Sequence, residues 1–436
     1  MNIASLRSLQ HDIASLLLYR QILDVDVVGS AFVSLIEQIY HTDTPTECLK
    51  AYSDWFSWLA SSGQSWQSYL IESILYDENP FTEAAQHAQT IDDIAPELIA
   101  AARHDLTILR RLYDCTSDQI GLWMRQACKL DALPVAPSSV VEPAPIAFDT
   151  TPDWGDLLSD LLTYHQTHGV GVFAQYRACR WEQDYIEGIP TPDPIGLDNL
   201  IGYDTPKAKL LQNTEFLLAG APAQHVLLYG SRGSGKSSLV KAIATDYADQ
   251  GLRLIEVDKS QLCHLPKIID QIRSSALKFV IFVDDLSFEE DDDAFKALKV
   301  VLEGNSTARA HNVVVYATTN RRHLIREFFD DRPRPSDADE IHSWDTVQEK
   351  LSFSDRFGLT LTFAPCNQDD YLRIIRHLAQ QADLTIHADD LTFRALQWAT
   401  QNNGRSGRTA RQFIDWLTAE QQLSLNPEFS QIKPIS

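Results

Sequence analysis

The sequence predicts an α/β fold: a parallel sheet with helices on both faces and a C-terminal helical lid, preceded by an all-α N-terminal domain. Apolar residues recur at helical spacing before residue 130 and again over 368–423. Nearly continuous apolar runs at 226–229, 278–283 and 312–317 are typical of strands buried on both faces. Segments of helical spacing separate the strands, which is the alternation expected of a parallel sheet.

The composition is that of an ordinary globular protein. The chain has 436 residues, of which 44% are hydrophobic and 22% charged, and this length leaves room for about three domains. No apolar run approaches the roughly twenty residues of a membrane-spanning helix, and the first residues lack the pattern of a signal peptide. The six cysteines are scattered without C-x-x-C spacing, as reduced thiols are. We therefore expect a cytoplasmic protein with no membrane contact.

The formal net charge of −23 bears on partners. Such a surface repels phosphate backbones at long range, so general nucleic-acid binding is disfavoured. Salt limits this field to about 8 Å, which leaves a local basic groove open. A cluster comprising Arg321, Arg322, His323 and Arg326 is the most basic stretch of the chain. Neutralisation of nearby acids or bridging between subunits is favoured for this cluster over DNA binding.

Residues 1–132 are predicted to form the helical N-terminal domain. This region is rich in aromatic residues, namely Trp55, Phe56, Trp58, Trp66 and Tyr69. Packing between helices is the favoured interpretation of these side chains, and a docking surface for another protein is the alternative. No catalytic set of residues is found here.

Residues 133–196 are predicted to be proline-rich linkers on either side of a helical segment over 154–188. His165 and His168 are three residues apart and so can share one helix face. A metal pair is conceivable, but no third ligand is suitably spaced, and surface or packing roles are favoured.

The strongest motif follows the apolar run at 226–229. Gly230, Gly235, Lys236 and Ser237 occupy every required position of G-x-x-x-x-G-K-[ST], the P-loop. The full candidate phosphate-binding set is Gly230, Ser231, Arg232, Gly233, Ser234, Gly235, Lys236, Ser237 and Ser238. Glycines and the start of the following helix offer N–H donors to phosphate, Lys236 would reach the β- and γ-phosphates, and the Ser237 hydroxyl would bind Mg²⁺. The motif predicts a nucleoside triphosphate site.

Two carboxylates close the apolar run at 278–283. Acids at the C-terminal end of a buried parallel strand lie where ligands bind in such sheets. Asp284 would hold Mg²⁺, and Asp285 would orient or deprotonate the attacking water. The acidic run at 289–293 is interpreted as a solvated turn rather than a second metal site. A further strand over 312–320 ends in Asn320, and we predict a nucleotide-binding domain over 197–365 followed by a helical lid over 366–436.

With these residues in place, the region 197–417 resembles an AAA+ ATPase. More closely, it is similar to one branch of that class, domain-of-unknown-function family eight-fifteen. The segments that carry the closer resemblance are Leu-Ile-Gly-Tyr at 200–203, Asn-Thr-Glu at 213–215, Asp-Asp-Leu-Ser-Phe at 284–288 and Asn-Arg-Arg-His-Leu at 320–324. About half of the chain is covered.

The resemblance implies ATP and Mg²⁺ as cofactors and assigns further roles. Asn320 corresponds to sensor 1, which helps to position the attacking water. Arg356 resembles the arginine finger, which reaches the nucleotide of a neighbouring subunit. Arg408 resembles sensor 2, which contacts phosphate from the lid, and Arg411 is a neighbour that could be confused with it. The class packs adenine at the position of Ile201, Gly202 and Tyr203.

Two departures from the class stand out. The usual acid pair is Asp-Glu, and here it is Asp284-Asp285. Because aspartate is one methylene shorter, Asp285 is expected to position water less well, and turnover is expected to be slow. Ser234 stands where many members have Thr, which we expect to be harmless.

The leading hypothesis is an AAA+ ATPase whose cycle drives conformational change in a homo-oligomer or in a protein partner bound by the N-terminal helices. Three alternatives remain open at this point. A nucleotide-gated interaction module would bind ATP tightly and hydrolyse little. A small-molecule P-loop kinase would need an acceptor pocket in the lid and no arginine from a neighbour. A DNA-loading ATPase would use the basic cluster.

Overall fold

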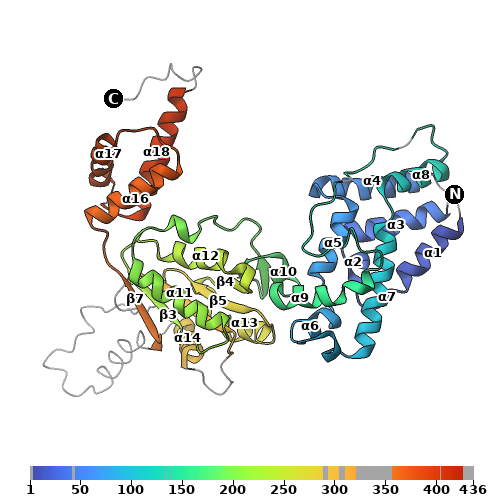
Figure 1. The fold of residues 1–436 in the computed structure, drawn as a ribbon, viewed down its shortest axis with the longest axis horizontal. Helices are drawn as coiled ribbons and strands as arrows, with labels where there is room; N and C mark the ends of the chain where they lie inside the picture. The colour runs from blue at the N-terminus through green and yellow to red at the C-terminus, as the bar shows by residue number, and fades with distance from the viewer. Residues whose placement is uncertain are drawn as a thin grey trace. The chain divides into compact units, whose positions relative to one another are not determined.

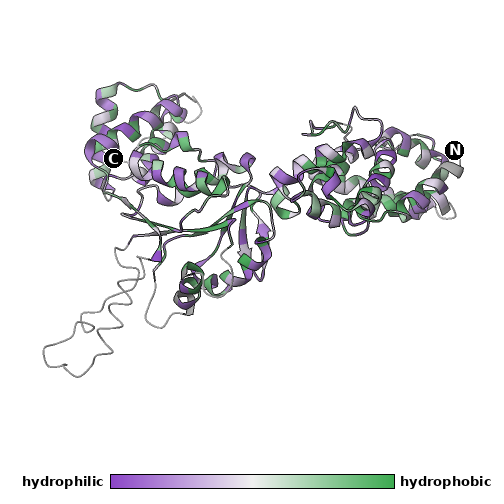
Figure 2. Cartoon of the chain, turned by 60° about the horizontal axis from the view of Figure 1, so that its bottom comes forward, coloured by the Kyte–Doolittle hydropathy of each residue, from purple (hydrophilic) through white to green (hydrophobic). Residues whose placement is uncertain are grey.

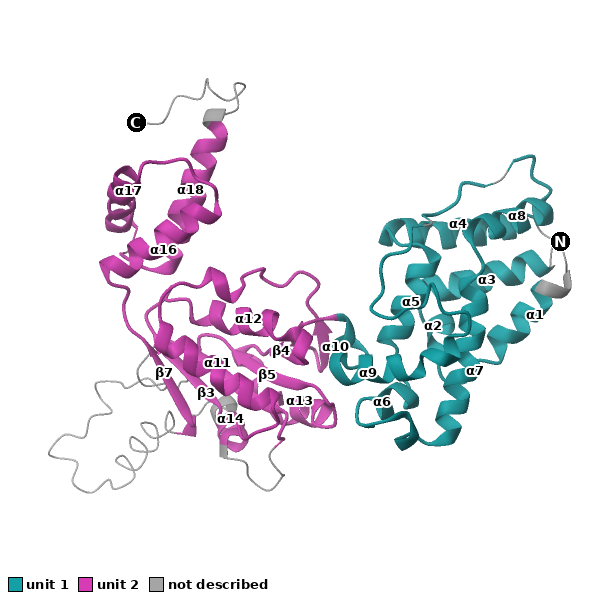
Figure 3. Ribbon diagram, viewed as in Figure 1, with its two compact units in different colours: residues 1–175 teal, residues 176–436 magenta. Residues whose placement is uncertain are grey.

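The chain forms two compact units, residues 1–175 and 176–436 (Figure 3). The computed structural model describes residues 3–41, 45–132, 134–138, 140–287, 293–303, 310–320, 356–402 and 404–425. Among these residues, no helix is long and apolar enough to cross a membrane.

In unit 1, all the regular secondary structure of the described residues is helical (Figure 1). Its α-helices are α1 (Ile3–Ala14), α2 (Gln21–Asp24), α3 (Val27–His41), α4 (Pro45–Ser62), α5 (Trp66–Tyr76), α6 (Pro80–Ala85), α7 (Pro96–Tyr113), α8 (Ser117–Cys128), α9 (Leu158–His168) and α10 (Val172–Gln175). Two 3₁₀ turns, η1 (Ile91–Asp93) and η2 (Trp154–Leu157), complete it. The helices α3 to α5 and α7 to α9 all contribute to a single hydrophobic core.

Aromatic side chains fill the centre of that core. Trp55 and Trp66 are fully buried, and the ring of Trp66 stacks on that of Phe32 with centroids 4.0 Å apart. Tyr69 is also buried, and its hydroxyl donates to the Ile22 carbonyl at 2.7 Å. The packing interpretation is confirmed for these residues, whereas Trp58 is 46% exposed.

The two histidines of α9 are packing residues. His165 is fully buried, and its Nδ1 lies 3.1 Å from the Gly169 carbonyl at the end of the helix. Burial lowers the pKa of His165 to about 4, so the ring stays neutral and donates there. The His168 ring stacks on Tyr164 with centroids 4.3 Å apart. In the part of the chain that is described, no group of three or more His, Cys, Asp and Glu is placed to hold a metal ion.

Unit 2 is built on a seven-stranded sheet of order β2-β1-β4-β5-β6-β3-β7. The strands are β1 (Ala178–Glu182), β2 (Tyr185–Gly188), β3 (Val226–Gly230), β4 (Leu252–Glu256), β5 (Lys278–Val283), β6 (Val313–Thr319) and β7 (Leu359–Phe363). All neighbours are parallel except β1 and β2. The carboxyl ends of β3, β5 and β6 therefore meet at one edge.

Helices cover both faces of this sheet, whose strands are largely hydrophobic (Figure 2). They are α11 (Asp204–Leu218), α12 (Lys236–Asp246), α13 (Leu265–Ile272) and α14 (Asp293–Glu303), with 3₁₀ turns η3 (Leu197–Asn199), η4 (Ala248–Gln250) and η5 (Lys259–His264). The lid consists of α16 (Gln368–Gln381), α17 (Ala388–Gln401) and α18 (Gly407–Leu425) and has a core of its own. The predicted fold class, an α/β sheet with a C-terminal helical lid behind an all-α region, is confirmed.

The predicted helix over 154–188 is wrong for residues 178–188, which form the β1–β2 hairpin. Ala178, Cys179 and Trp181 are buried while Arg180 is exposed, because β1 pairs with β4 inside the sheet. The turn residues Gln183 and Asp184 both have positive φ, 44° and 76°. Such turns usually carry Asn-Gly or Asp-Gly, and this pair offers no such signal.

The packing also differs from the expected four-part division at residues 132, 196 and 365. Trp154, Leu158 and Leu161 belong to the same core as the first eight helices, so the first unit continues to Gln175. The hairpin that follows belongs to the sheet of the second unit. Hydrophobic contact, rather than proline content, decides where one unit ends.

Candidate nucleotide-binding site

The P-loop joins β3 to α12 at the carboxyl edge of the sheet. Gly233 and Gly235 have φ of 76° and 85°, a conformation that L side chains rarely adopt. Gly235 immediately precedes α12, whose first residue is Lys236. The loop therefore presents successive backbone N–H groups and a helix start, which is the arrangement that binds phosphate.

Lys236 lies inside the loop and is only 7% exposed. Its Nζ donates to the carbonyls of Gly230 at 2.8 Å and Ser231 at 2.9 Å. Burial lowers the pKa of Lys236, and the negative charges of Asp284 and Asp285 oppose that shift. The ammonium is thus a largely desolvated cation, which attracts an anion such as phosphate more strongly than a lysine in water does.

Ser237 and Asp284 come together as the sequence predicted. Ser237 Oγ donates to Asp284 Oδ1 at 2.6 Å. This bond leaves lone pairs on the hydroxyl oxygen, and Mg²⁺ prefers oxygen ligands from one or two side chains together with phosphates and water. The two residues therefore fit a magnesium ion shared with a bound triphosphate.

Asp285 and Asn320, predicted from two different strands, are also in contact. Asn320 Nδ2 donates to Asp285 Oδ1 at 2.8 Å. Arg232 of the P-loop approaches the other oxygen at 3.9 Å, but both partners are well exposed, so this pair contributes little to stability. Asp285 has φ of 50°, which directs the chain sharply away from the end of β5. The two residues that were predicted to position water thus meet through this bond.

Thr318, which no motif in the sequence indicated, links the Asp284 carboxylate to the backbone of Asp285. It is 2% exposed, and its hydroxyl bonds to Asp284 Oδ1 and to the backbone N–H of Asp285. The only signal in the sequence was that the apolar run of β6 is followed by three polar residues, Thr318, Thr319 and Asn320.

The segment predicted to pack against adenine, residues 201–203, contacts both the sheet domain and the lid. Ile201 packs against the lid core, and Tyr203 packs against the core of the sheet. The Tyr203 hydroxyl donates to the Ala364 carbonyl at 3.0 Å, and its ring lies 5.0 Å from that of Phe363. Gly202 between them has φ of 91°. The segment is thus placed beside the end of β7, next to the P-loop strand.

The lid reaches the P-loop through the start of α18. A Cβ added at Gly233 would lie 2.9 Å from Ser406 Oγ and 3.1 Å from Arg408 Cβ. Arg408 is exposed, and its charge lowers the pKa of Lys236. Arg411 instead lines a shallow surface cavity of the lid with Leu378. Of the two arginines, Arg408 is the one beside the phosphate loop.

Arg356 lies away from this site in the chain. Val226 pairs with Leu359 and Gly230 with Phe363, so the two parallel strands run together from the amino edge of the sheet to the P-loop. Arg356 precedes Leu359, and the five residues of β7 span roughly 16 Å at about 3.3 Å each. That distance exceeds the reach of an arginine side chain.

The structure leaves some predicted features undescribed. The basic cluster at 321–326 and the acidic run at 289–292 lie outside the described residues. The side chain of Asp293, the last of those acids, lies outside them as well.

A family model described as "Protein of unknown function (DUF815)" matches residues 174–421, more than half of the chain. The chain belongs to this family. The match begins two residues before unit 2 and ends within α18, so the DUF815 region is the sheet with its lid. In this region β6 lies between the P-loop strand β3 and the acid-ended strand β5, and the helical lid follows β7, which is the architecture of an AAA+ P-loop domain. No match was found among the curated proteins.

Solved structures offer only distant likenesses. The RuvB Holliday junction branch migration motor of Thermotoga maritima is 17% identical with a TM-score of 0.31, over 51% of this chain and 72% of that chain. The FIGL-1 AAA domain in complex with ADP is 18% identical with a TM-score of 0.37, over 55% of this chain and 78% of that chain. At these values neither likeness carries an argument about this DUF815 protein.

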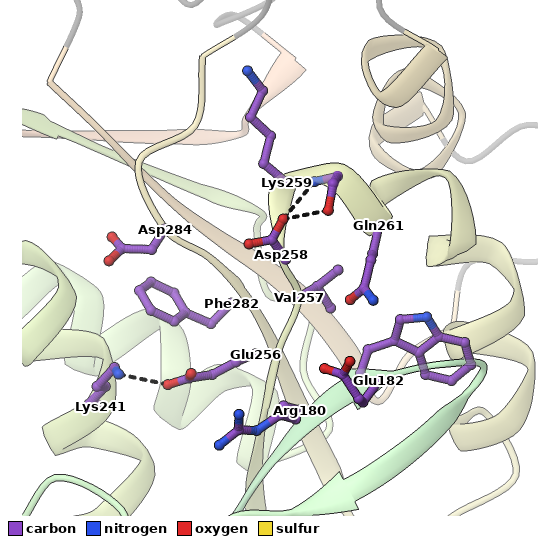
Figure 4. Close-up of a pocket in the computed structure, with 12 residues that line it drawn as sticks. Arg180, Glu182, Lys241, Glu256, Val257, Asp258, Lys259, Gln261, Phe282 and Asp284 are labelled. Carbon is purple, nitrogen blue, oxygen red and sulfur yellow. Dashed lines mark hydrogen bonds and ion pairs between the residues drawn. The ribbon is translucent and has the colours of Figure 1, made fainter.

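A polar cavity adjoins the site in the DUF815 region (Figure 4). Its volume is about 620 Å³, and it lies at the carboxyl ends of β1, β4 and β5. Arg180 and Glu182 of the hairpin line one wall, Lys241 and Glu256 form an ion pair of 2.8 Å, and Asp284 borders the cavity on the side of the P-loop. The sequence did not indicate this cavity, because the hairpin that walls it was predicted to be helical.

Proposed function

We propose that this protein is an AAA+ ATPase that binds ATP with Mg²⁺, hydrolyses it, and so changes the conformation of a homo-oligomer or of a protein partner. One observation carries the proposal. Five residues that follow three separate strands, β3, β5 and β6, meet at a single sheet edge: Lys236, Ser237, Asp284, Asp285 and Asn320. This combination provides for phosphate binding, a cation and a water-positioning group together.

Binding would use the loop and its lysine. The N–H groups from Gly233 to Ser237 would donate hydrogen bonds to the phosphate oxygens. The Nζ of Lys236, which donates to the carbonyls of Gly230 and Ser231 in this structure, would donate to the phosphate oxygens as well. Ser237 and Asp284 would hold Mg²⁺, which neutralises charge on the β- and γ-phosphates. Ile201 and Tyr203 would flank the base between the sheet and the lid.

Hydrolysis would use the pair at the ends of β5 and β6. Asp285 would accept a hydrogen bond from the attacking water, which forms the new bond to the γ-phosphorus as the bond to the bridging oxygen breaks. Asn320 would hold the Asp285 carboxylate in place through its bond of 2.8 Å. Arg408 would stabilise the phosphates from the lid side.

The position of Arg356 supports a homo-oligomer. In its own subunit the residue lies at the amino edge of the sheet, on the wrong side of β7 for its own nucleotide. If Arg356 stabilises charge in the transition state, it acts on the nucleotide of a neighbour. We also propose a protein partner for the N-terminal helices, where Trp58 is 46% exposed on α4. Nucleic acid is a disfavoured partner at a net charge of −23, and the proposed compartment is the cytoplasm.

A small-molecule kinase is a second candidate, favoured by the cavity beside Asp284. An acceptor bound there would lie next to the proposed magnesium residue. This cavity is walled by β1, β4 and β5 rather than by the lid, where an acceptor pocket was expected. A kinase would transfer the γ-phosphate to an added small molecule, whereas an ATPase releases inorganic phosphate with no acceptor present.

The test is Lys236→Ala, with binding of ATP and Mg²⁺ measured by calorimetry on the full chain. We expect affinity to fall at least tenfold, about 1.4 kcal/mol, because the cation that faces the phosphates is lost. Lys241→Ala is the matched control: it removes a lysine from the same helix, where its ammonium pairs with Glu256 instead. Wild-type affinity in Lys236→Ala would refute the phosphate site.

A further inference from the structure

Thr318 is placed between the two acidic residues of the site. It lies near the carboxyl end of β6 and is 2% exposed. Its Oγ1 bonds to Asp284 Oδ1, and it lies 3.0 Å from the backbone nitrogen of Asp285. The direction of both bonds is determined, since a backbone N–H only donates and an ionised carboxylate only accepts. One buried hydroxyl therefore accepts from Asp285 and donates to Asp284.

The first consequence concerns the Asp284 carboxylate. Its Oδ1 also accepts from Ser237 Oγ at 2.6 Å and from the Asp285 N–H at 3.1 Å. Three donors on one oxygen hold the plane of the carboxylate in a fixed direction. With Oδ1 so occupied, Oδ2 is the oxygen through which Asp284 would hold Mg²⁺ or a water bound to it.

The second consequence concerns the turn after β5. Asp285 has φ of 50°, in the left-handed region that non-glycine residues seldom adopt. The Thr318 hydroxyl holds the N–H of Asp285, and the Thr318 carbonyl accepts from the N–H of Leu286 at 2.7 Å. Thr318 thus binds both residues of the turn that directs the Asp285 carboxylate toward Asn320.

We propose that Thr318 is a positioning residue that sets Asp284 for magnesium and Asp285 for water at the same time. This inference rests on the proposed ATPase function. Groups that hold a metal-binding side chain in place typically change metal affinity or activity by about 10- to 100-fold when they are removed. The proposal predicts that the hydroxyl, rather than the volume of the side chain, carries the effect.

The test uses Thr318→Val, which keeps the shape and removes the hydroxyl, and Thr318→Ser, which keeps the hydroxyl. Thr319→Val is the matched control, because it removes the hydroxyl of the adjacent, equally buried residue of β6. The readouts are the Mg²⁺ concentration for half-maximal ATP hydrolysis, the affinity for ATP with Mg²⁺ and with a chelator, and the melting temperature.

In Thr318→Val we expect the Mg²⁺ requirement to rise about tenfold or more, while affinity for ATP in the chelator stays within about twofold of wild type. Thr318→Ser and Thr319→Val should keep the wild-type Mg²⁺ requirement. A Thr318→Val protein with wild-type Mg²⁺ dependence and turnover would overturn the inference and leave the ATPase function standing. If Thr318→Val does not fold, Thr318→Ser decides, since a raised Mg²⁺ requirement there would show that the hydroxyl is not what matters. A wild-type chain that binds no nucleotide would refute the proposed function itself.

Discussion

Asp285→Asn separates the charge of the proposed water-positioning group from its shape. The new amide has the same size, and its carbonyl oxygen can still accept the bond of 2.8 Å from Asn320 Nδ2. The pair with Arg232 at 3.9 Å is lost, but its partners are 77% and 62% exposed, so the free energy of unfolding should barely change. Since Lys236, Ser237 and Asp284 are unaltered, ATP should still bind.

Turnover should fall by a large factor. General-base and water-orienting groups contribute about 10²- to 10⁴-fold to a rate, which corresponds to roughly 2.7–5.4 kcal/mol at 1.36 kcal/mol per tenfold change. The lower part of this range is expected here, because we expect aspartate, which is one methylene shorter than glutamate, to position water less well. The Asp285→Asn protein should therefore retain ATP rather than convert it to ADP.

The assay is phosphate release at saturating ATP and Mg²⁺, together with chromatography of the nucleotide that remains on the protein. Asp270→Asn is the control, because it removes the same charge from the exposed surface of α13, where Asp270 pairs with Arg273. The reasoning would be refuted by an Asp285→Asn protein that hydrolyses ATP at the wild-type rate. Another group would then have to orient the water.

Two further predictions concern assembly and stability. Specific ATPase activity should rise with protein concentration, and added Arg356→Ala subunits should lower the activity per wild-type subunit. Activity that is independent of concentration would contradict the proposal that Arg356 acts on the nucleotide of a neighbouring subunit. Asp105→Ala should destabilise unit 1 by roughly 3 kcal/mol or more, measured by urea unfolding. The fully buried Asp105 carboxylate accepts from the N–H groups of residues 17, 18 and 19 at 2.7–3.0 Å, and the substitution would leave each of these groups unpaired. Asp156→Ala removes a carboxylate that is 72% exposed and should change little; equal losses in the two variants would contradict the assignment.

The sequence predicted the parts of the site that are encoded by neighbouring residues. The P-loop is a contiguous motif in which glycines and the start of a helix establish the backbone geometry locally, and the structure shows Gly233, Gly235 and Lys236 in that geometry. The acids at 284 and 285 were found because an apolar run ends at them, and the end of a parallel strand is a position that sequence alone can locate. Asn320 likewise follows directly on a largely apolar strand, β6.

Tertiary structure alone decided which of these strand ends lie beside one another. Thr318 joins Asp284 to Asp285 because β6 pairs with β5 in one register, 34 residues apart in the chain, and nothing local to Thr318 reveals that partner. The hairpin at 178–188 was taken for a helix because its strand character comes from pairing with β4, more than seventy residues later. Arg356 was assigned by motif, yet only the parallel register of β3 and β7 places it at the sheet edge remote from its own P-loop. A motif defines backbone shape within a few residues, whereas register between distant strands depends on which hydrophobic faces are buried together, and that is a property of the whole packed sheet.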